Sequence, residues 1–211
     1  MARSSPMDDA PDHALPPSRR NPPPRLYDGL VGCLDRLGLG RLRGDLSRGL
    51  DGDVLELGVG SGRQLPHYPA GVVVTGVDPD AAALRLAERR SPGVRLLVAE
   101  AEALPFDDAS FDWVVSALVL CTVRDPDLAL REVRRVLRPG GRLRVLEHVR
   151  SPHRLVARAQ GLANPLWGVV AGGCRLDRPT EEHIASSGFT LVGRRAHLGG
   201  HVIVLEAEAP A

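Results

Sequence analysis

The sequence contains no lysine, so arginine is its only strongly basic residue. Its 27 basic residues are balanced by 26 acidic residues, and the net charge is +1. Proteins that hold nucleic acid through its phosphates need a one-sided basic surface. Arg-Arg pairs do occur, but acidic residues lie close to most of them, and we interpret the pairs as solvated faces. The composition therefore argues against a nucleic-acid partner.

Long apolar runs are also missing. A membrane-spanning helix needs about 18 apolar residues in succession, whereas the longest run here, 114–121, has the length of a buried strand. The N-terminus has no hydrophobic signal region and contains Asp8, Asp9 and Asp12, which argues against a secretory signal. We therefore expect a cytoplasmic protein without a stable membrane anchor.

Cysteine is sparse and scattered. Cys33, Cys121 and Cys174 form no Cys-x-x-Cys pair, so their spacing indicates neither a disulfide framework nor a zinc site. We therefore expect no bound metal. Cys121 is interpreted as a core residue. Cys174 is either a packing residue or a contact to a substrate.

The first 24 residues are rich in proline, serine, aspartate and arginine. Such a stretch buries too little surface to offset its ordering entropy, and it is predicted to be a disordered tail. Residues 25–211 are predicted to form one domain. Within it, residues 25–50 place leucines at intervals of three to five residues, which predicts amphipathic helical structure interrupted by glycines.

From residue 53 onward, short apolar strands alternate with helices. Pro79 is expected in the first turn of a helix over 79–90, and Pro139-Gly140-Gly141 is expected to end a second helix over 128–137. Alternation of this kind predicts a parallel sheet covered on both faces, and the last two strands are expected to form an antiparallel hairpin. The predicted fold is therefore α/β and Rossmann-like, with a seven-stranded, mostly parallel sheet, a C-terminal antiparallel hairpin and helices on both faces. The predicted strands are 53–57, 72–77, 94–98, 111–116, 143–147, 189–194 and 201–207.

A glycine-rich loop follows the first predicted strand, with the pattern Glu56-x-Gly58-x-Gly60-x-Gly62. Glycines there let the backbone turn sharply and approach a ligand closely. Asp78 ends the next strand about 20 residues later, where a carboxylate can accept hydrogen bonds from both ribose hydroxyls. NAD enzymes normally use Gly-x-Gly-x-x-Gly, and the spacing found here favours S-adenosylmethionine, which has no pyrophosphate. The alternative is a tight strand-to-helix turn that binds nothing.

These motifs resemble those of the class I methyltransferases of the ubiquinone/menaquinone-biosynthesis type. A narrower resemblance links the chain to the methyltransferase-like alkyl-thiol methyltransferases of animals. Those relatives carry a hydrophobic N-terminal membrane anchor, which the polar tail replaces here. The broader resemblance is carried by 56–62, 77–79, 100–106, 110–112 and 135–141, and the narrower one by 67–71, 118–123, 147–149 and 164–176.

The resemblance implies S-adenosylmethionine as cofactor. The glycine loop would pass close to its methionine part, Asp78 would take the ribose, and Ser116 would border the sulfonium. Glu100 and Ala101 would flank the adenine, although the family usually has aspartate at the position of Glu100. The complete set of expected cofactor contacts is Glu56, Gly58, Gly60, Gly62, Asp78, Pro79, Glu100, Ala101 and Ser116.

His148 ends the predicted fifth strand, where open α/β sheets place ligands. A histidine with the usual pKa near 6.5 can accept a proton from a thiol or hydroxyl group, so His148 is the candidate catalytic residue. The alternative is a histidine that is only hydrogen-bonded at a strand end. Glu147 either orients His148 or is a polar strand terminus. Trp167 and Cys174 are candidate substrate contacts.

We predict methyl transfer by in-line displacement to a small-molecule acceptor, with a thiol preferred. The segments 25–50 and 150–180 would form the lid over the substrate. Alternative acceptors are an amine, a phospholipid headgroup or a quinone-like ring. A non-catalytic cofactor-binding regulator and a nicotinamide oxidoreductase remain as further alternatives. The sequence does not define the oligomeric state.

Overall fold

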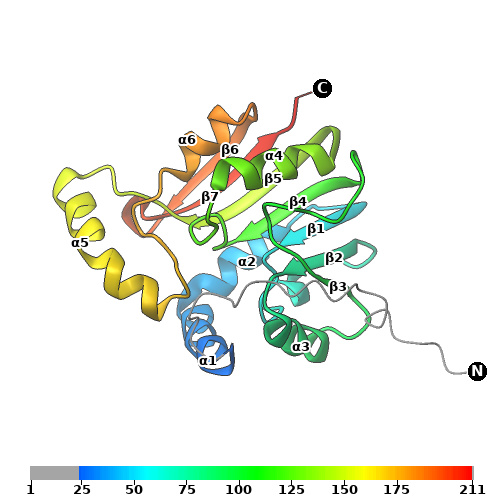
Figure 1. Cartoon of the computed structure of the whole chain (residues 1–211), viewed down its shortest axis with the longest axis horizontal. Helices are drawn as coiled ribbons and strands as arrows, with labels where there is room; N and C mark the ends of the chain where they lie inside the picture. The colour runs from blue at the N-terminus through cyan, green and yellow to red at the C-terminus, as the bar shows by residue number, and fades with distance from the viewer. Residues whose placement is uncertain (1–23, 211) are drawn as a thin grey trace, which may run out of the picture.

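The computed structural model describes residues 24–210, in which seven strands form one sheet (Figure 1). The predicted tail 1–24 lies outside this range, apart from Pro24. The strand order is β3-β2-β1-β4-β5-β7-β6. Strands β1 to β5 pair in parallel, and β7 runs antiparallel to both β5 and β6. The predicted fold class is confirmed. The strands are β1 Asp53–Leu57, β2 Val73–Asp78, β3 Arg95–Val98, β4 Phe111–Ala117, β5 Leu137–His148, β6 Thr190–His197 and β7 Val202–Glu208.

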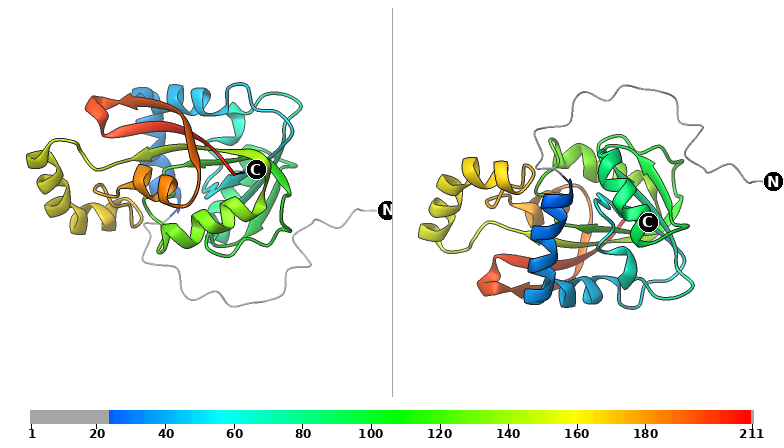
Figure 2. Two further views of the ribbon diagram at one scale, coloured as in Figure 1. Left: turned by 90° about the horizontal axis from the view of Figure 1, so that it is seen from above. Right: turned by 90° about the horizontal axis from the view of Figure 1, so that it is seen from below.

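Helices cover both faces of the sheet (Figure 2). Leu130 of α4 and Ile184 of α6 are fully buried in the core on one face. Leu46 of α2 and Leu84 of α3 are buried on the other face. The helices are α1 Pro24–Leu34, α2 Gly40–Ser47, α3 Ala81–Arg90, α4 Pro126–Val136, α5 Arg154–Val170 and α6 Thr180–Ser186. Short π- or 3-10-helical turns span Asp35–Leu39, Leu65–His67 and Leu198–Gly200.

Several predicted boundaries differ from the structure by a few residues, and two of these differences have a clear physical cause. Helix α3 begins at Ala81, because the Asp80 side chain caps it by accepting hydrogen bonds from the backbone N–H groups of Ala82 and Ala83. Pro79 therefore precedes the cap and is not in the first turn. Strand β5 begins at Leu137, directly after α4, where Leu137 pairs with Phe111. The Pro139-Gly140-Gly141 segment thus lies within the strand, with Gly140 at φ +72°.

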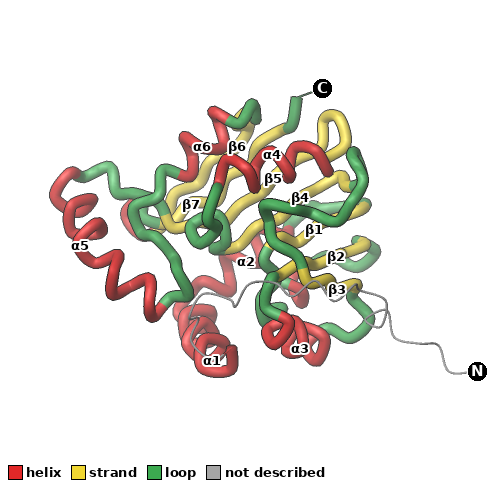
Figure 3. The backbone as a smooth tube through the Cα atoms, viewed as in Figure 1, coloured by secondary structure: helices red, strands yellow, loops and turns green. Residues whose placement is uncertain are grey.

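The parallel strands bring their carboxyl ends to one edge of the sheet, which positions the candidate site. Leu57, Asp78, Ala117 and His148 end β1, β2, β4 and β5 there. Each of these strands is followed by a loop, drawn in green in Figure 3. Helix α5 follows β5 and stands away from the sheet at the left of Figure 1.

No side chain of α5 is buried, and Leu162 on this helix is 85% exposed. Helix α5 falls within the predicted lid segment 150–180, and α1 and α2 fall within 25–50. The lid function of these segments stays a prediction. Among the described residues, no helix combines the length and the apolar character needed to cross a membrane.

Candidate functional site

The glycine loop connects β1 to the rest of the site and adopts left-handed backbone conformations. Gly58, Gly60 and Gly62 have φ values of +65°, +53° and +78°. A Cβ at Gly58 would lie 2.5 Å from a methyl group of Val119, and one at Gly62 would lie 2.8 Å from the backbone of Ala87. At Gly60, by contrast, nothing lies closer than 4.0 Å. Gly58 and Gly62 thus serve packing, whereas Gly60 leaves open space in front of the loop.

Asp78 lies directly against this loop, as the sequence predicts. Its Oδ2 accepts a hydrogen bond from Gly60 N–H at 2.8 Å, and its Oδ1 accepts one from Asp80 N–H at 2.8 Å. Burial raises the pKa of Asp78 to about 6, although both hydrogen bonds act to lower it. The carboxyl group is therefore held in place beside the open space at Gly60. Its contact with a ribose stays a prediction.

Two buried polar atoms near the end of β1 meet no hydrogen-bond geometry among the described residues, although the Tyr68 hydroxyl group lies next to one of them, on Glu56. Glu56 is 2% exposed, and its Oε2 accepts no hydrogen bond. Burial raises the pKa of Glu56 to about 8. Ser116 of β4 is fully buried, and its Oγ is also unpartnered. Buried polar groups are nearly always hydrogen-bonded in folded proteins, so this arrangement fits a polar ligand that carries both donors and acceptors.

The other residues expected to contact the cofactor have no observed hydrogen bond with the glycine loop among the described residues. Glu100 forms an ion pair with Arg124 at 2.8 Å. Ala101 is 8% exposed and packs in the core, and Pro79 is exposed. The assignment of Glu100 and Ala101 to the adenine stays a prediction.

Helix α1 is fastened to the glycine loop by an ionic cluster that the sequence did not reveal. Asp28 accepts hydrogen bonds from the Ser61 hydroxyl group, from Arg63 Nε at 2.8 Å and from Arg90 Nη2 at 3.2 Å. Burial alone raises the pKa of Asp28, but these hydrogen bonds outweigh it and lower the pKa. The N-terminal helix is therefore anchored to the residue between Gly60 and Gly62.

At the end of β5, Glu147 organises the loop that follows β4. It is fully buried, and its Oε1 accepts N–H hydrogen bonds from Val119 at 2.9 Å and Leu120 at 2.8 Å. Its Oε2 accepts a third from Cys121 N–H at 3.2 Å. Glu147 thus holds a backbone segment, and no hydrogen bond joins it to His148 among the described residues.

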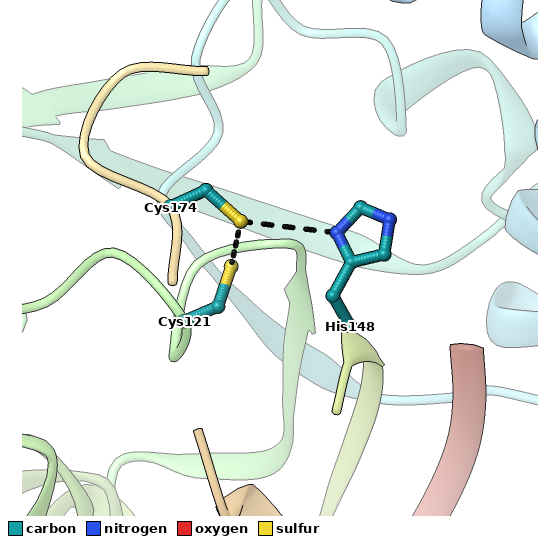
Figure 4. Close-up of side chains that lie close together, drawn as sticks. All are labelled: Cys121, His148 and Cys174. Carbon is teal, nitrogen blue, oxygen red and sulfur yellow. Dashed lines mark hydrogen bonds between the residues drawn. The ribbon is translucent and has the colours of Figure 1, made fainter. Parts of the chain in front are cut away.

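His148 lies beside the two buried cysteines (Figure 4). Its Nδ1 is 3.8 Å from Cys174 Sγ, and Cys174 Sγ is 3.3 Å from Cys121 Sγ. Trp167 of α5 packs against the small cluster formed by Cys121, Ala171 and Cys174, and its ring meets the His148 ring edge-on with centroids 6.4 Å apart. The structure therefore brings together all three residues expected at the acceptor end, together with Cys121.

The pKa values of the two thiols are shifted in opposite directions. The hydrogen bond with Cys121 lowers the pKa of Cys174, burial acts against this, and His148 lowers it further. The same sulfur–sulfur contact, together with burial, raises the pKa of Cys121. Burial alone lowers the pKa of His148, but the Cys174 sulfur outweighs it and the pKa is raised. The sulfur–sulfur contact thus favours the thiolate form at Cys174 and the protonated thiol at Cys121.

The chain is similar in sequence to known methyltransferases. Residues 55–145 match the family model described as a methyltransferase domain. The thiol S-methyltransferase TMT1B of Rattus norvegicus is 40% identical over 147 residues, which cover 66% of this chain and 60% of that protein. The ubiquinone/menaquinone biosynthesis C-methyltransferase UbiE of Hahella chejuensis is 38% identical over 130 residues, which cover 54% and 52%. The chain thus spans about 60% or less of the length of these relatives.

Solved structures share the fold. A SAM-dependent methyltransferase from Methanosarcina mazei matches with a TM-score of 0.60 at 28% identity, covering 76% of this chain and 93% of that one. The [4+2]-cyclase SpnF matches with a TM-score of 0.66 at 20% identity, covering 81% of both chains. Because a cyclase shares this architecture, the fold alone does not define the chemistry.

Proposed function

We propose that the chain transfers the methyl group of S-adenosylmethionine to the thiol of a small molecule, as expected from the match of residues 55–145 to a methyltransferase domain and from the fold shared with a SAM-dependent methyltransferase. The observation that carries the cofactor assignment is the group formed by Gly60, Asp78 and Glu56. This group combines open space beside the loop with a carboxyl group already oriented there and a buried oxygen that accepts no hydrogen bond.

In this proposal, Asp78 accepts the ribose hydroxyl hydrogens, and Glu56 faces the cationic amino group of the methionine part. S-adenosylmethionine supplies a methyl group already activated on a sulfonium, so the protein's tasks are alignment and the exclusion of water. Ser116 borders the reacting end from β4. Asp28 keeps α1 close to the loop, which supports the assignment of 25–50 to the lid.

His148 is proposed to take the proton of the acceptor, since the thiolate is the reactive nucleophile. Its Nδ1 faces Cys174, and the other ring nitrogen points away from both cysteines in Figure 4. No side-chain hydrogen bond engages Nε2 among the described residues, so Nε2 is left to meet an acceptor. Trp167 would form an apolar wall of the acceptor pocket.

The thiol is preferred because of the 40% identity with a thiol S-methyltransferase. The 38% identity with a C-methyltransferase of quinone biosynthesis supports a quinone-like ring as the second candidate. Amines and phospholipid headgroups are further alternatives. None of the relatives described above is named as a nicotinamide oxidoreductase.

Two measurements test the proposal. Calorimetric titration should show binding of S-adenosylmethionine, and binding of NAD in its place would refute the cofactor assignment. Transfer of a radiolabelled methyl group should then be followed on a panel of thiols, phenols and amines. We expect thiols to be methylated and the rate to fall at least ~100-fold in His148→Asn, with the exposed His153→Asn as matched control. Cofactor binding without methylation of any acceptor would favour a regulatory protein.

A further inference from the structure

Cys121, His148 and Cys174 come from three separate segments of the chain. Cys121 lies in the loop after β4, His148 is the last residue of β5, and Cys174 lies in the segment after α5. Cys121 is fully buried and Cys174 is 5% exposed. The two sulfur atoms and a ring nitrogen of His148 all lie within 4.8 Å of one another (Figure 4). The proposed methyl transfer uses one of these groups, His148, as a proton acceptor, and apart from the predicted substrate contact of Cys174 it gives the pair of buried thiols no role.

The spacing of these atoms is close to that of a metal centre. Zinc binds cysteine sulfur at about 2.3 Å and histidine nitrogen at about 2.0 to 2.1 Å in tetrahedral geometry. Ligand atoms around such an ion lie roughly 3.5 to 3.8 Å apart. The separations found are 3.3 Å between the sulfur atoms and 3.8 Å between Cys174 Sγ and His148 Nδ1. These two distances need to change by only a few tenths of an ångström, and the distance between Cys121 Sγ and the His148 ring nitrogen, at most 4.8 Å, needs to shorten somewhat more. The three ligand atoms would then occupy three of the four corners of a tetrahedron.

The backbone around the thiols is held in place before any ion binds. Glu147 accepts the N–H of Cys121 at 3.2 Å, and the Cys121 carbonyl group accepts the N–H of Arg175 at 3.0 Å. The second of these bonds ties the two cysteine-bearing segments together. Outer hydrogen bonds of this kind orient metal ligands and strengthen binding. Trp167 packs its apolar ring against the cluster that contains the two cysteines.

The charges around the cluster are also compatible with a cation. Glu147 carries a buried carboxyl group beside it, and Arg178 donates to the carbonyl groups of Leu120 and Val123 at 2.7 and 2.8 Å. A divalent ion bound by two thiolates adds no net charge to the region, whatever the charge on these two groups. Burial of an uncompensated charge is thereby avoided.

We propose that Cys121, Cys174 and His148 form a binding site for a thiophilic divalent cation of the Zn²⁺ type, with a fourth coordination position left open. Zn²⁺ forms bonds to the two sulfur atoms and to Nδ1, and each thiol that is protonated beforehand releases its proton to solvent. Three protein ligands and one open position are the arrangement of catalytic zinc sites. The open position takes water or an added thiol. The site requires neither cofactor nor acceptor, so metal binding is tested apart from methyl transfer. With the ion on Nδ1, the neutral ring carries its proton on Nε2, so the metal-bound state is distinct from the state in which His148 takes the proton of the acceptor.

The test uses the full chain, reduced and freed of metal with a chelator, without cofactor or acceptor. Addition of Co²⁺ should produce sulfur-to-cobalt charge-transfer absorption that saturates at one equivalent, and Zn²⁺ should displace it. Cys121→Ser, Cys174→Ser and His148→Ala should each weaken binding at least ~10-fold. Cys33→Ser is the matched control, because Cys33 is exposed and lies in α1, and it should bind as the parent does.

A second measurement needs no variant. Zn²⁺ should protect Cys121 and Cys174 from alkylation in the parent protein, while Cys33 reacts at an unchanged rate, as read by mass spectrometry of the labelled peptides. Absence of one-equivalent binding, or loss of binding in Cys33→Ser alone, overturns the proposal. Protein in which Cys121 and Cys174 form a disulfide, and whose reduced form binds no Zn²⁺, overturns it as well.

Discussion

Gly60 is the position of the glycine loop at which a substitution should best distinguish an effect on ligand binding from an effect on folding. We predict that Gly60→Ala leaves the protein folded but weakens the binding of S-adenosylmethionine at least ~10-fold, which corresponds to about 1.4 kcal/mol. A Cβ at this position meets no atom closer than 4.0 Å, so the folded protein has room for it. The added methyl group would occupy the open space in which the cofactor is proposed to lie. Alanine also keeps the N–H that donates to Asp78.

The cost to folding can be worked out separately. Gly60 has φ +53°, and a left-handed conformation costs a residue with a Cβ about 1 to 2 kcal/mol. The matched control is Gly93→Ala, at φ +87° in an exposed turn with nothing within 4 Å. Both variants should lose a similar free energy of unfolding in urea, and Gly60→Ala alone should lose affinity in calorimetry. A folded Gly60→Ala protein with the affinity of the parent would refute the placement of the cofactor.

Three further predictions concern the neighbouring residues. Gly62→Ala should lower the free energy of unfolding by about 2 to 4 kcal/mol, because a Cβ would lie 2.8 Å from the Ala87 backbone at φ +78°; an unchanged urea midpoint would contradict this packing. Burial raises the pKa of Asp78 to about 6. Its carboxyl group therefore gains a proton as the pH falls through 6, and cofactor affinity should drop below that pH until it levels off near the affinity of Asp78→Ala. Calorimetry across this range should show no such slope in Asp78→Ala, which itself binds at least ~1 kcal/mol more weakly. Glu147→Gln should destabilise the fold by about 1 to 3 kcal/mol, since an amide N–H₂ cannot accept from Cys121 N–H; a thermal melt equal to that of the parent would count against it.

The proximity of the residues proposed to bind the cofactor could be predicted from the sequence because its signals are local. Glu56, Gly58, Gly60 and Gly62 lie within seven residues, and Asp78 ends the next strand. In a parallel sheet these positions must meet at one edge. Hydrogen bonds within the site, such as that from Gly60 to Asp78, then follow from the topology.

The first six residues of β5 and the whole of α5 escaped prediction for physical reasons. Strand β5 begins six residues earlier than predicted, because Pro-Gly-Gly is typical of a turn, whereas here it follows a strand residue that already pairs with Phe111. Helix α5 buries no side chain and contains Pro165. Its apolar residues therefore do not form the inward-facing stripe from which amphipathic helices are recognised.

The cluster of two cysteines and a histidine escaped because its members are far apart in sequence. Cys121 and Cys174 are 53 residues apart, and His148 is 26 residues from Cys174. Motif spacing detects metal ligands only when they share a turn or a hairpin. One signal was present: residues that follow β4 and end β5 must be neighbours at the same edge, which places Cys121 beside His148.

Near the proposed acceptor site, a strained backbone conformation is stabilised by hydrogen bonds to a neighbouring side chain. Leu118, the residue after β4, has φ +63°, which costs a branched side chain about 1 to 2 kcal/mol. Burial also raises the pKa of Glu147 to about 7, so its ionised form is disfavoured where it stands. Both costs are offset by the three N–H groups that Glu147 binds immediately after Leu118. Strain of this kind persists only where surrounding contacts over-determine a conformation. The loop that carries Cys121 is therefore set by Glu147 before any ligand arrives, and His148, the next residue in β5, is placed by the same strand end.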